Sequence, residues 1–399
     1  MDELRNPYRP GAGTPPPALL GRDALIDRFG TAMRRTLAGR PGKSLMPIGL
    51  RGVGKTVLLN RFCEIAANEG ARCGFIEAPE TGDFPARLGA RVRTILLDLD
   101  RAGRASAVVS RALQAFKGFT MHFPSGESVS IDLQPLAGLA DSGNLADDLT
   151  DLLVATGEAA RDRSTGVVIA VDEVQYLDVH ELSALVSAIH RTTQLDLPVL
   201  LVGAGLPQVP ALSGDAKSYA ERLFDFPRVD SLAREDAFGA ISIPAAEAGV
   251  SFEEAALDAI FTESRGYPYF LQEWGYHVWN QASGSPITRA DVEAVKPRVE
   301  QQLDENFFRV RFDRMTPKER EYLRAMAELG AGPHRSGDIA RGLGVVVESV
   351  GPRRQTLISK GMIYSPAHGD TAFTVPLFDD FLRRAMPGWR ARRRRSRRH

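Results

Sequence analysis

One short stretch, residues 49–56 (GLRGVGKT), constrains the fold of this chain more than any other. It fits the pattern G-x-x-x-x-G-K-[ST] and lies between an apolar run and a segment with helical spacing. Its glycines allow the backbone to turn so that several N–H groups point inward at phosphate oxygens. The helix that begins near Lys55 adds its positive N-terminal end at the same place. This phosphate loop therefore predicts a nucleoside-triphosphate site.

The side chains of the phosphate loop have separate expected roles. We expect Lys55 to reach the β- and γ-phosphates, where it also serves catalysis, and the Thr56 hydroxyl to ligate Mg²⁺. The other positions expected to bind the nucleotide are Gly49, Arg51, Gly52, Val53, Gly54 and Val57. The expected cofactors are ATP and Mg²⁺. A chance glycine loop containing a lysine is the alternative, but the flanking strand and helix favour a nucleotide site.

A second feature is the apolar run of residues 166–171 (GVVIAV), which ends in Asp172 and Glu173. A continuous β-branched run predicts a strand that is buried on both faces of a parallel sheet. Such sheets place their ligands at the C-terminal ends of their strands. We therefore expect Asp172 to hold Mg²⁺ through water and Glu173 to polarise the attacking water as general base. A strand capped by two solvated acids is the alternative.

The length of 399 residues predicts two or three domains. The expected parts are an extended arm (1–18), an α/β domain (19–230), a helical lid (231–304), a winged helix-turn-helix (305–387) and an Arg-rich tail (388–399). Three short helices followed by a hairpin are what predict the winged helix. Inside the α/β domain, alternation at Phe119, Met121 and Phe123, and again over 129–133, predicts a β-hairpin insertion at about 116–134.

Composition excludes several classes of protein. Hydrophobic and charged contents of 43% and 25% are those of a globular chain. No apolar run approaches the length of about 18 residues that spans a membrane, and the N-terminus has no signal-peptide core. Cys63 and Cys73 are the only cysteines, and their spacing argues against metal or disulfide roles. We therefore expect a cytoplasmic protein.

Taken together, these motifs resemble the AAA+ superfamily of P-loop ATPases, in the branch of origin-recognition initiators, STAND ATPases and their bacterial and archaeal relatives. Four features match in order over roughly residues 16–385: Leu20–Asp23, the phosphate loop, the strand ending in Asp172 and Glu173, and Gly266–Pro268 before a lid helix. The resemblance implies an α/β fold with a parallel sheet of order 5-1-4-3-2, an all-α lid and a C-terminal winged helix. It also implies that Gly21, Arg22 and Pro268 flank the adenine.

The chain departs from the family pattern at two places. The strand after the acidic pair ends in residues 203–205 (GAG), which offer no polar sensor side chain. The lid helix that starts near Tyr269 has no Arg to face the γ-phosphate, although Arg265 lies just before it. These departures imply slow, switch-like hydrolysis of ATP to ADP and phosphate.

Arg222 is the candidate for an arginine finger, acting in its own subunit or in a neighbouring one. The alternative is a surface arginine that pairs with Glu221 or Asp225.

The C-terminal helix-turn-helix has two interpretations. Its candidate DNA contacts are Arg353, Arg354, Gln355 and Lys360. The last ten residues hold seven Arg, which suit phosphate backbones or form a solvated terminus. Leu357 and Ile358 on the same helix suit packing on another domain, and in the STAND branch a winged helix often clamps the nucleotide domain.

Three functions therefore remain open. The first is an ATP-driven switch that passes its nucleotide state to DNA or a protein partner. The second is a replication-initiator-like DNA-binding protein that ATP locks in one form. The third is a partner-regulated subunit of a larger assembly or homo-oligomer, with residues 119–133 as its docking element.

Overall fold

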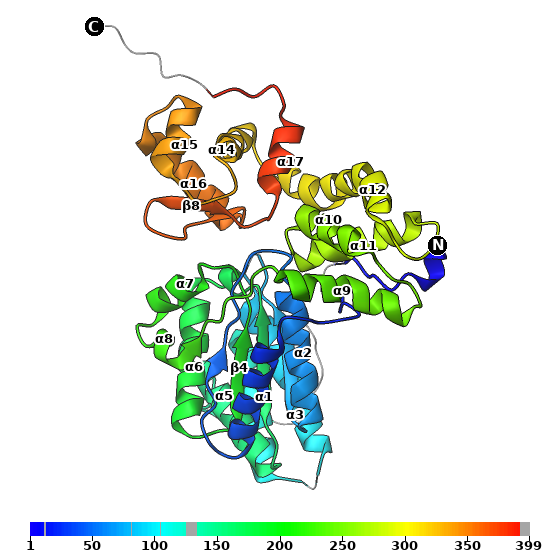
Figure 1. Ribbon diagram of the computed structural model, residues 1–399. Helices are drawn as coiled ribbons and strands as arrows, with labels where there is room; N and C mark the ends of the chain where they lie inside the picture. Colours follow the sequence, from blue (N-terminus) through cyan, green and yellow to red (C-terminus); the bar gives the residue numbers. More distant parts are fainter. Residues whose placement is uncertain (12, 81, 104, 125–133, 392–399) are drawn as a thin grey trace, which may run out of the picture. The chain divides into compact units, whose positions relative to one another are not determined.

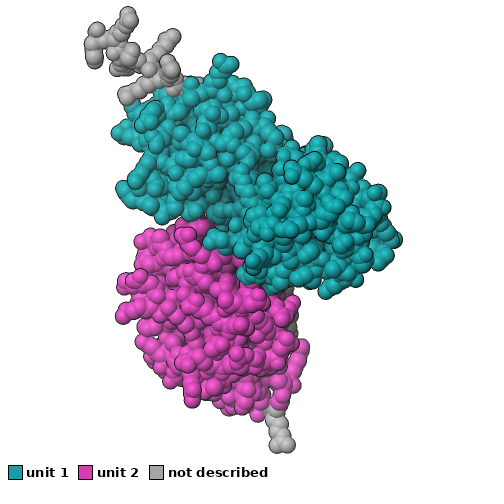
Figure 2. Space-filling view, in the orientation of Figure 1, with its two compact units in different colours: residues 1–21, 50–54, 230–399 teal, residues 22–49, 55–229 magenta. Residues whose placement is uncertain are grey.

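The computed structural model describes residues 1–11, 13–80, 82–103, 105–124 and 134–391 (Figure 1). The chain forms two compact units, coloured separately in Figure 2. Unit 1 consists of Met1–Gly21, Leu50–Gly54 and Asp230–His399, and unit 2 consists of Arg22–Gly49 and Lys55–Val229.

Unit 2 is built on a parallel sheet. Its strands are β1 (Ser44–Leu45), β2 (Arg72–Glu77), β3 (Val167–Asp172), β4 (Val199–Gly203) and β5 (Phe224–Asp225). They lie in the order β2-β3-β4-β1-β5, which from the other edge is the predicted order 5-1-4-3-2. Every residue of β3 and β4 is buried, as expected of parallel strands covered by helices on both faces. The predicted α/β fold class is thereby confirmed.

Helices surround this sheet (Figure 1). They are α1 (Asp23–Leu37), α2 (Lys55–Asn68), α3 (Phe84–Arg101), α4 (Ala107–His122), α5 (Leu145–Asp162), α6 (Val179–Gln194), α7 (Val209–Ala216) and α8 (Ala220–Leu223), with the single turn η2 (Val174–Tyr176) after β3. The phosphate-loop helix α2 packs against α1, β2 and β3. Phe29 of α1 stacks on Phe62 of α2, with ring centroids 4.5 Å apart.

The predicted β-hairpin is wrong where the structure can test it. Phe119 and Met121 belong to α4, which ends at His122, and Phe123 is its C-terminal cap. The buried side chains of α4 recur at helical spacing at positions 109, 112, 113, 116 and 119, whereas Met121 is 64% exposed. The alternation of Phe119, Met121 and Phe123 therefore comes from the end of a helix in which Met121 is exposed. The second expected strand, over 129–133, lies outside the described residues.

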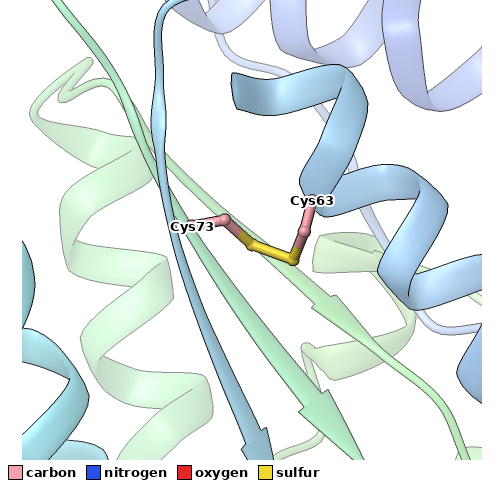
Figure 3. Close-up of a disulfide and its surroundings, with 2 residues drawn as sticks. All are labelled: Cys63 and Cys73. Atoms are coloured by element: carbon pink, nitrogen blue, oxygen red, sulfur yellow. A yellow bond between two sulfur atoms is a disulfide. The ribbon is translucent and has the colours of Figure 1, made fainter. Parts of the chain in front are cut away.

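The two cysteines form a disulfide, so the expectation that they have no such role is wrong. Cys63 in α2 and Cys73 in β2 are bonded, with their Cα atoms 5.5 Å apart (Figure 3). Both residues are half-buried. Their spacing carries no recognisable disulfide pattern, because the pairing arises only when α2 folds back onto the neighbouring strand.

Unit 1 is helical apart from one small sheet. The lid contains α9 (Arg234–Glu247), α10 (Glu254–Ser264), α11 (Pro268–Gln281) and α12 (Arg289–Gln302). The C-terminal segment (305–387) contains most of η3 (Leu303–Arg309, a π-helix), α13 (Val310–Asp313), α14 (Pro317–Glu328), α15 (Ser336–Leu343), η4 (Val347–Val350), α16 (Gly351–Ser359) and α17 (Phe378–Ala385). Its antiparallel strands β6 (His334–Arg335), β7 (Ile363–Tyr364) and β8 (Asp370–Phe373) lie in the order β6-β8-β7.

An aromatic core joins the lid to the C-terminal segment. Phe270 of α11 contacts Phe307 of η3, with ring centroids 5.4 Å apart. The adjacent Phe308 stacks on Phe381 of α17 at 5.2 Å. The expected boundary near residue 305 therefore falls inside η3, and the two parts share one hydrophobic core.

The N-terminal arm, which includes η1 (Glu3–Arg5), packs on the lid. The Tyr8 ring is buried, and its hydroxyl donates to the Ile241 carbonyl at 2.6 Å. The Met1 amino group donates to the Ala282 carbonyl at 2.7 Å. Among the described residues, no helix combines the length and apolar character needed to cross a membrane.

Candidate functional site

The phosphate loop turns at two glycines. Gly52 and Gly54 have φ angles of +80° and +90°, in the left-handed region that favours glycine. A Cβ atom on Gly54 would have no heavy atom within 4 Å, so the backbone faces open space there. A Cβ atom on Gly52 would lie 3.3 Å from the Cβ atom of Tyr269. The loop therefore exposes its backbone on one side and packs closely on α11 at Gly52.

Lys55 is the first residue of α2 and is only 6% exposed. Its Nζ atom donates a hydrogen bond to the Gly49 carbonyl at 3.0 Å. A buried ammonium group needs acceptors around it, and here the first glycine of the motif supplies one. The predicted motif lysine thus lies next to the start of the phosphate loop, and its neighbour Val57 lies in the same helical turn.

Thr56 and Asp172 lie in direct contact at the C-terminal end of β3. The Thr56 hydroxyl donates to Oδ2 of Asp172 at 2.5 Å, and the Glu173 N–H donates to Oδ1 at 2.9 Å. Asp172 is 3% exposed, and this burial raises the pKa of its carboxyl, while the Thr56 hydrogen bond lowers it and the Glu173 charge raises it. A desolvated carboxylate beside a hydroxyl offers the hard oxygen ligands that Mg²⁺ prefers. These two residues therefore fit a magnesium site.

Glu173 follows directly after β3 in an unusual conformation. Its φ and ψ angles are 53° and 41°, a left-handed conformation that a non-glycine residue rarely adopts. Its Oε2 atom accepts a hydrogen bond from the side-chain amide of Gln175. Gln175 was not predicted, because its only signal in the sequence is an amide side chain two residues after the acidic pair.

The apex of the phosphate loop is bonded to other parts of unit 1. The Arg51 N–H donates to the Thr374 carbonyl in the C-terminal segment at 3.0 Å. The Tyr269 N–H, in the first turn of α11, donates to the Gly52 carbonyl at 3.2 Å. Neither Tyr269 nor Thr374 was predicted, because backbone contacts between distant segments leave no residue pattern.

The residues expected around the adenine belong to different units. Gly21 in unit 1 has a φ angle of +66°, and a Cβ atom there would lie 2.6 Å from Oδ2 of Asp236. Pro268, also in unit 1, is the first residue of α11, which suits proline because its missing N–H costs no helical hydrogen bond. Arg22 is buried in unit 2.

The two expected arginines near the site have different surroundings. Arg222 is exposed in α8, and it forms no ion pair with any residue that the structure describes. Asp225, one of its two expected surface partners, instead pairs with Arg28. Arg265 before the lid helix pairs with Asp380 of α17 at 2.9 Å.

The four candidate DNA contacts differ in whether their side chains are already bonded within the C-terminal segment. Arg354 donates to the Thr371 hydroxyl at 2.9 Å, the Ser365 hydroxyl at 2.7 Å and the Asp370 carbonyl at 2.9 Å. Lys360 pairs with Glu319 at 2.8 Å. These two side chains therefore hold the C-terminal segment together. Arg353 is half-buried and Gln355 is exposed, and most of the basic tail (392–399) lies outside the described residues.

Comparisons with known proteins agree with this fold. Residues 18–202 match the family described as the AAA ATPase domain, and residues 305–382 match a domain of unknown function (DUF8462). A search of curated proteins found no match.

Several solved structures match this chain at low sequence identity. A Walker-type ATPase of Pyrococcus abyssi is 16% identical, with a TM-score of 0.52 over 92% of this chain and 96% of that one. The RuvB Holliday junction branch migration motor of Thermotoga maritima is 16% identical, with a TM-score of 0.44 over 88% and 92%. The Orc1 protein of Aeropyrum pernix, solved with DNA, is 14% identical, with a TM-score of 0.45 over 92% and 94%.

Proposed function

We propose that this chain, whose residues 18–202 match the AAA ATPase domain family, is an AAA+ P-loop ATPase that acts as an ATP-dependent switch. It binds ATP with Mg²⁺, hydrolyses ATP slowly and passes its nucleotide state to the lid and the C-terminal segment. The single observation that carries this proposal is the pair of backbone hydrogen bonds at the loop apex, from Arg51 to Thr374 and from Tyr269 to Gly52.

In this proposal the phosphate loop and the end of β3 hold the nucleotide and its metal ion. Lys55 turns from the Gly49 carbonyl toward the β- and γ-phosphates. The Thr56 hydroxyl and the Asp172 carboxylate, already in contact, hold Mg²⁺. The remaining nucleotide contacts are assigned by family resemblance to Gly21, Arg22, Gly49, Arg51, Gly52, Val53, Gly54, Val57 and Pro268.

Hydrolysis is assigned to Glu173 and Lys55. Mg²⁺, when bound, would neutralise negative charge on the phosphate oxygens. Glu173 accepts a proton from the attacking water, and Lys55 neutralises charge on the γ-phosphoryl group. Arg222, exposed and without an ion pair among the described residues, is proposed as an arginine finger toward a neighbouring subunit.

The Arg51 N–H supports the proposed link between the nucleotide and the C-terminal segment, because the Thr374 carbonyl and the phosphate oxygens compete for it. A residue has a single N–H group, and that of Arg51 is held by the Thr374 carbonyl. When phosphate oxygens recruit the N–H groups of the loop, this hydrogen bond is given up. Nucleotide binding therefore acts directly on the C-terminal segment.

The experiment compares two lysines. Lys55→Ala should abolish tight ATP binding in a calorimetric titration while the melting temperature stays close to that of the wild type. Lys43→Ala is the matched control, because Lys43 is exposed just outside the phosphate loop, and its affinity should be that of the wild type. Equal ATP affinity in both variants would contradict the assignment.

We further interpret the C-terminal segment as a winged helix that contacts either DNA or a protein partner. For DNA, the exposed Gln355 and half-buried Arg353 remain as contacts. The exposed valines at positions 345, 346 and 347, which follow α15 and run into the first residue of η4, favour a protein partner or a second copy of the chain. Gel-shift titration with Arg353→Ala and Gln355→Ala distinguishes a DNA partner from a protein partner. A loss of DNA affinity in these variants is expected only if DNA is the partner.

A further inference from the structure

Gln175 connects Glu173 to the backbone that follows β4. Its Oε1 atom accepts a hydrogen bond from the Leu206 N–H at 2.9 Å, and its Nε2 atom donates to Oε2 of Glu173. The orientation of the amide follows from these partners. A backbone N–H can only donate, so the oxygen must face Leu206, which leaves the NH₂ group facing the carboxylate.

The chain leaves space for this side chain. A Cβ atom on Gly205 would lie 2.8 Å from Oε1 of Gln175 and 2.5 Å from Cγ2 of Val209. Any larger residue at position 205 would therefore displace Gln175. The Val174 N–H donates to the Ala204 carbonyl at 2.9 Å, so that η2 is also bonded to this turn through its backbone. The lack of a side chain on Gly205 is what lets Gln175 reach this turn.

Glu173 needs such a partner. Its left-handed backbone is held by its surroundings rather than by its own preference. Its carboxylate accepts a hydrogen bond from the Gln175 amide, and the oxygen of that amide is held in turn by the Leu206 N–H. The carboxylate therefore has a defined direction relative to the end of β3.

We propose that Gln175 is a positioning residue for Glu173, fixing the carboxylate through the backbone after β4. This inference rests on the proposed role of Glu173 as general base. In that step the water oxygen bonds to the γ-phosphorus and the bond from phosphorus to the ADP oxygen breaks. The water proton passes to Glu173, whose direction Gln175 sets.

Removing the amide should slow catalysis without weakening substrate binding. We expect Gln175→Ala to lower kcat about ten- to hundredfold, a part of the 10²–10⁴ that a general base supplies. KM for ATP should stay unchanged, since Gln175 lies outside the phosphate loop. Gln194→Ala is the matched control, because Gln194 is exposed at the end of α6. An unchanged kcat in Gln175→Ala would overturn the inference.

A second variant of the same size keeps the test valid if Gln175→Ala unfolds. Gln175→Glu retains the acceptor for the Leu206 N–H but places a second carboxylate beside Glu173. The new side chain has no N–H to donate to Glu173, so kcat should fall as in Gln175→Ala while KM for ATP and the melting temperature stay those of the wild type. An unchanged kcat in this variant counts against positioning.

A double variant separates failure of this inference from failure of the proposed function. In the Glu173→Gln background, Gln175→Ala should cause no further loss of kcat, because the group it positions is gone. A further loss of the same size would mean that Gln175 acts elsewhere. If Glu173→Gln alone turned over like the wild type, the general-base role itself would fall, and the positioning inference with it.

Discussion

At the scale of single residues, the ionisation of Asp172 links the stability of the fold to the proposed Mg²⁺ site. Burial holds the pKa of its carboxyl above the ordinary value of 3.8. The folded chain therefore keeps the proton to higher pH than the unfolded chain. The resulting stabilisation is complete below about pH 4 and is lost as the pH rises through the raised pKa.

We therefore predict that the stability of the protein depends on pH through Asp172. The free energy of unfolding of the nucleotide-free protein should fall over that window, and the fall should be smaller in Asp172→Asn, which carries no charge. Urea unfolding at a series of pH values measures both. Added Mg²⁺ and ATP should reduce the fall in the wild type, because a cation favours the carboxylate. Parallel pH curves for the two proteins would show that Asp172 is not the responsible group.

Single residues also show where prediction from sequence ends. Lys55, Thr56 and Asp172 could be proposed as site residues, because phosphate binding demands a lysine and a hydroxyl at fixed spacing in the loop and an acidic residue at the end of a buried strand lies where parallel sheets bind ligands. Gln175 and Thr374 could not, because each acts through a contact between segments far apart in the sequence.

At the scale of elements, α2 is attached to the sheet at two points. Thr56 in its first turn bonds to Asp172 of β3, and Cys63, two turns later, is bonded to Cys73 of β2. The cysteines are 10 residues apart, and a disulfide between them reduces the conformational entropy of the unfolded chain. In the chain-entropy model this raises the free energy of unfolding by about 3 kcal/mol. The disulfide therefore stabilises the element that carries Lys55 and Thr56, which we propose to bind phosphate and Mg²⁺.

The second prediction concerns this cross-link. A dithiol reductant should lower the free energy of unfolding of the wild type by about 3 kcal/mol at most, measured by urea unfolding of the full chain. The variant Cys63→Ser/Cys73→Ser is the control and should not respond to the reductant. An equal response in both proteins would assign the effect to the reductant itself, and no response in the wild type would contradict the stabilising role.

The elements differ in how well the sequence predicted them. An amphipathic helix such as α1 (Asp23–Leu37) can be recognised from sequence, because its apolar stripe repeats at helical spacing. The apolar run before the phosphate loop forms the strand β1 only over Ser44–Leu45, and Pro47 just beyond it has no N–H for a sheet hydrogen bond. The hairpin failed because alternation over three residues cannot be told from a helix with one exposed apolar side chain.

At the scale of the whole molecule, the apex of the phosphate loop belongs to unit 1, together with the lid and the C-terminal segment. The aromatic contacts of Phe270, Phe307 and Phe308 make the lid and the C-terminal segment share one core. A change at Arg51 and Gly52 is therefore expected to reach both parts. For the proposed switch, moving such an equilibrium from 1:99 to 99:1 needs about 5.5 kcal/mol of differential nucleotide binding.

The most direct test of the switch is amide hydrogen exchange of the full chain with ATP and Mg²⁺, with ADP, and without nucleotide. We expect ATP to slow exchange over 50–57, where phosphates take up the N–H groups, and to speed it over 371–376, where the Thr374 contact is released. ADP should cause the smaller change, and Lys55→Ala should respond to neither nucleotide. If ATP binds yet exchange over 371–376 is the same in all three states, the protein is an ATPase without this switch.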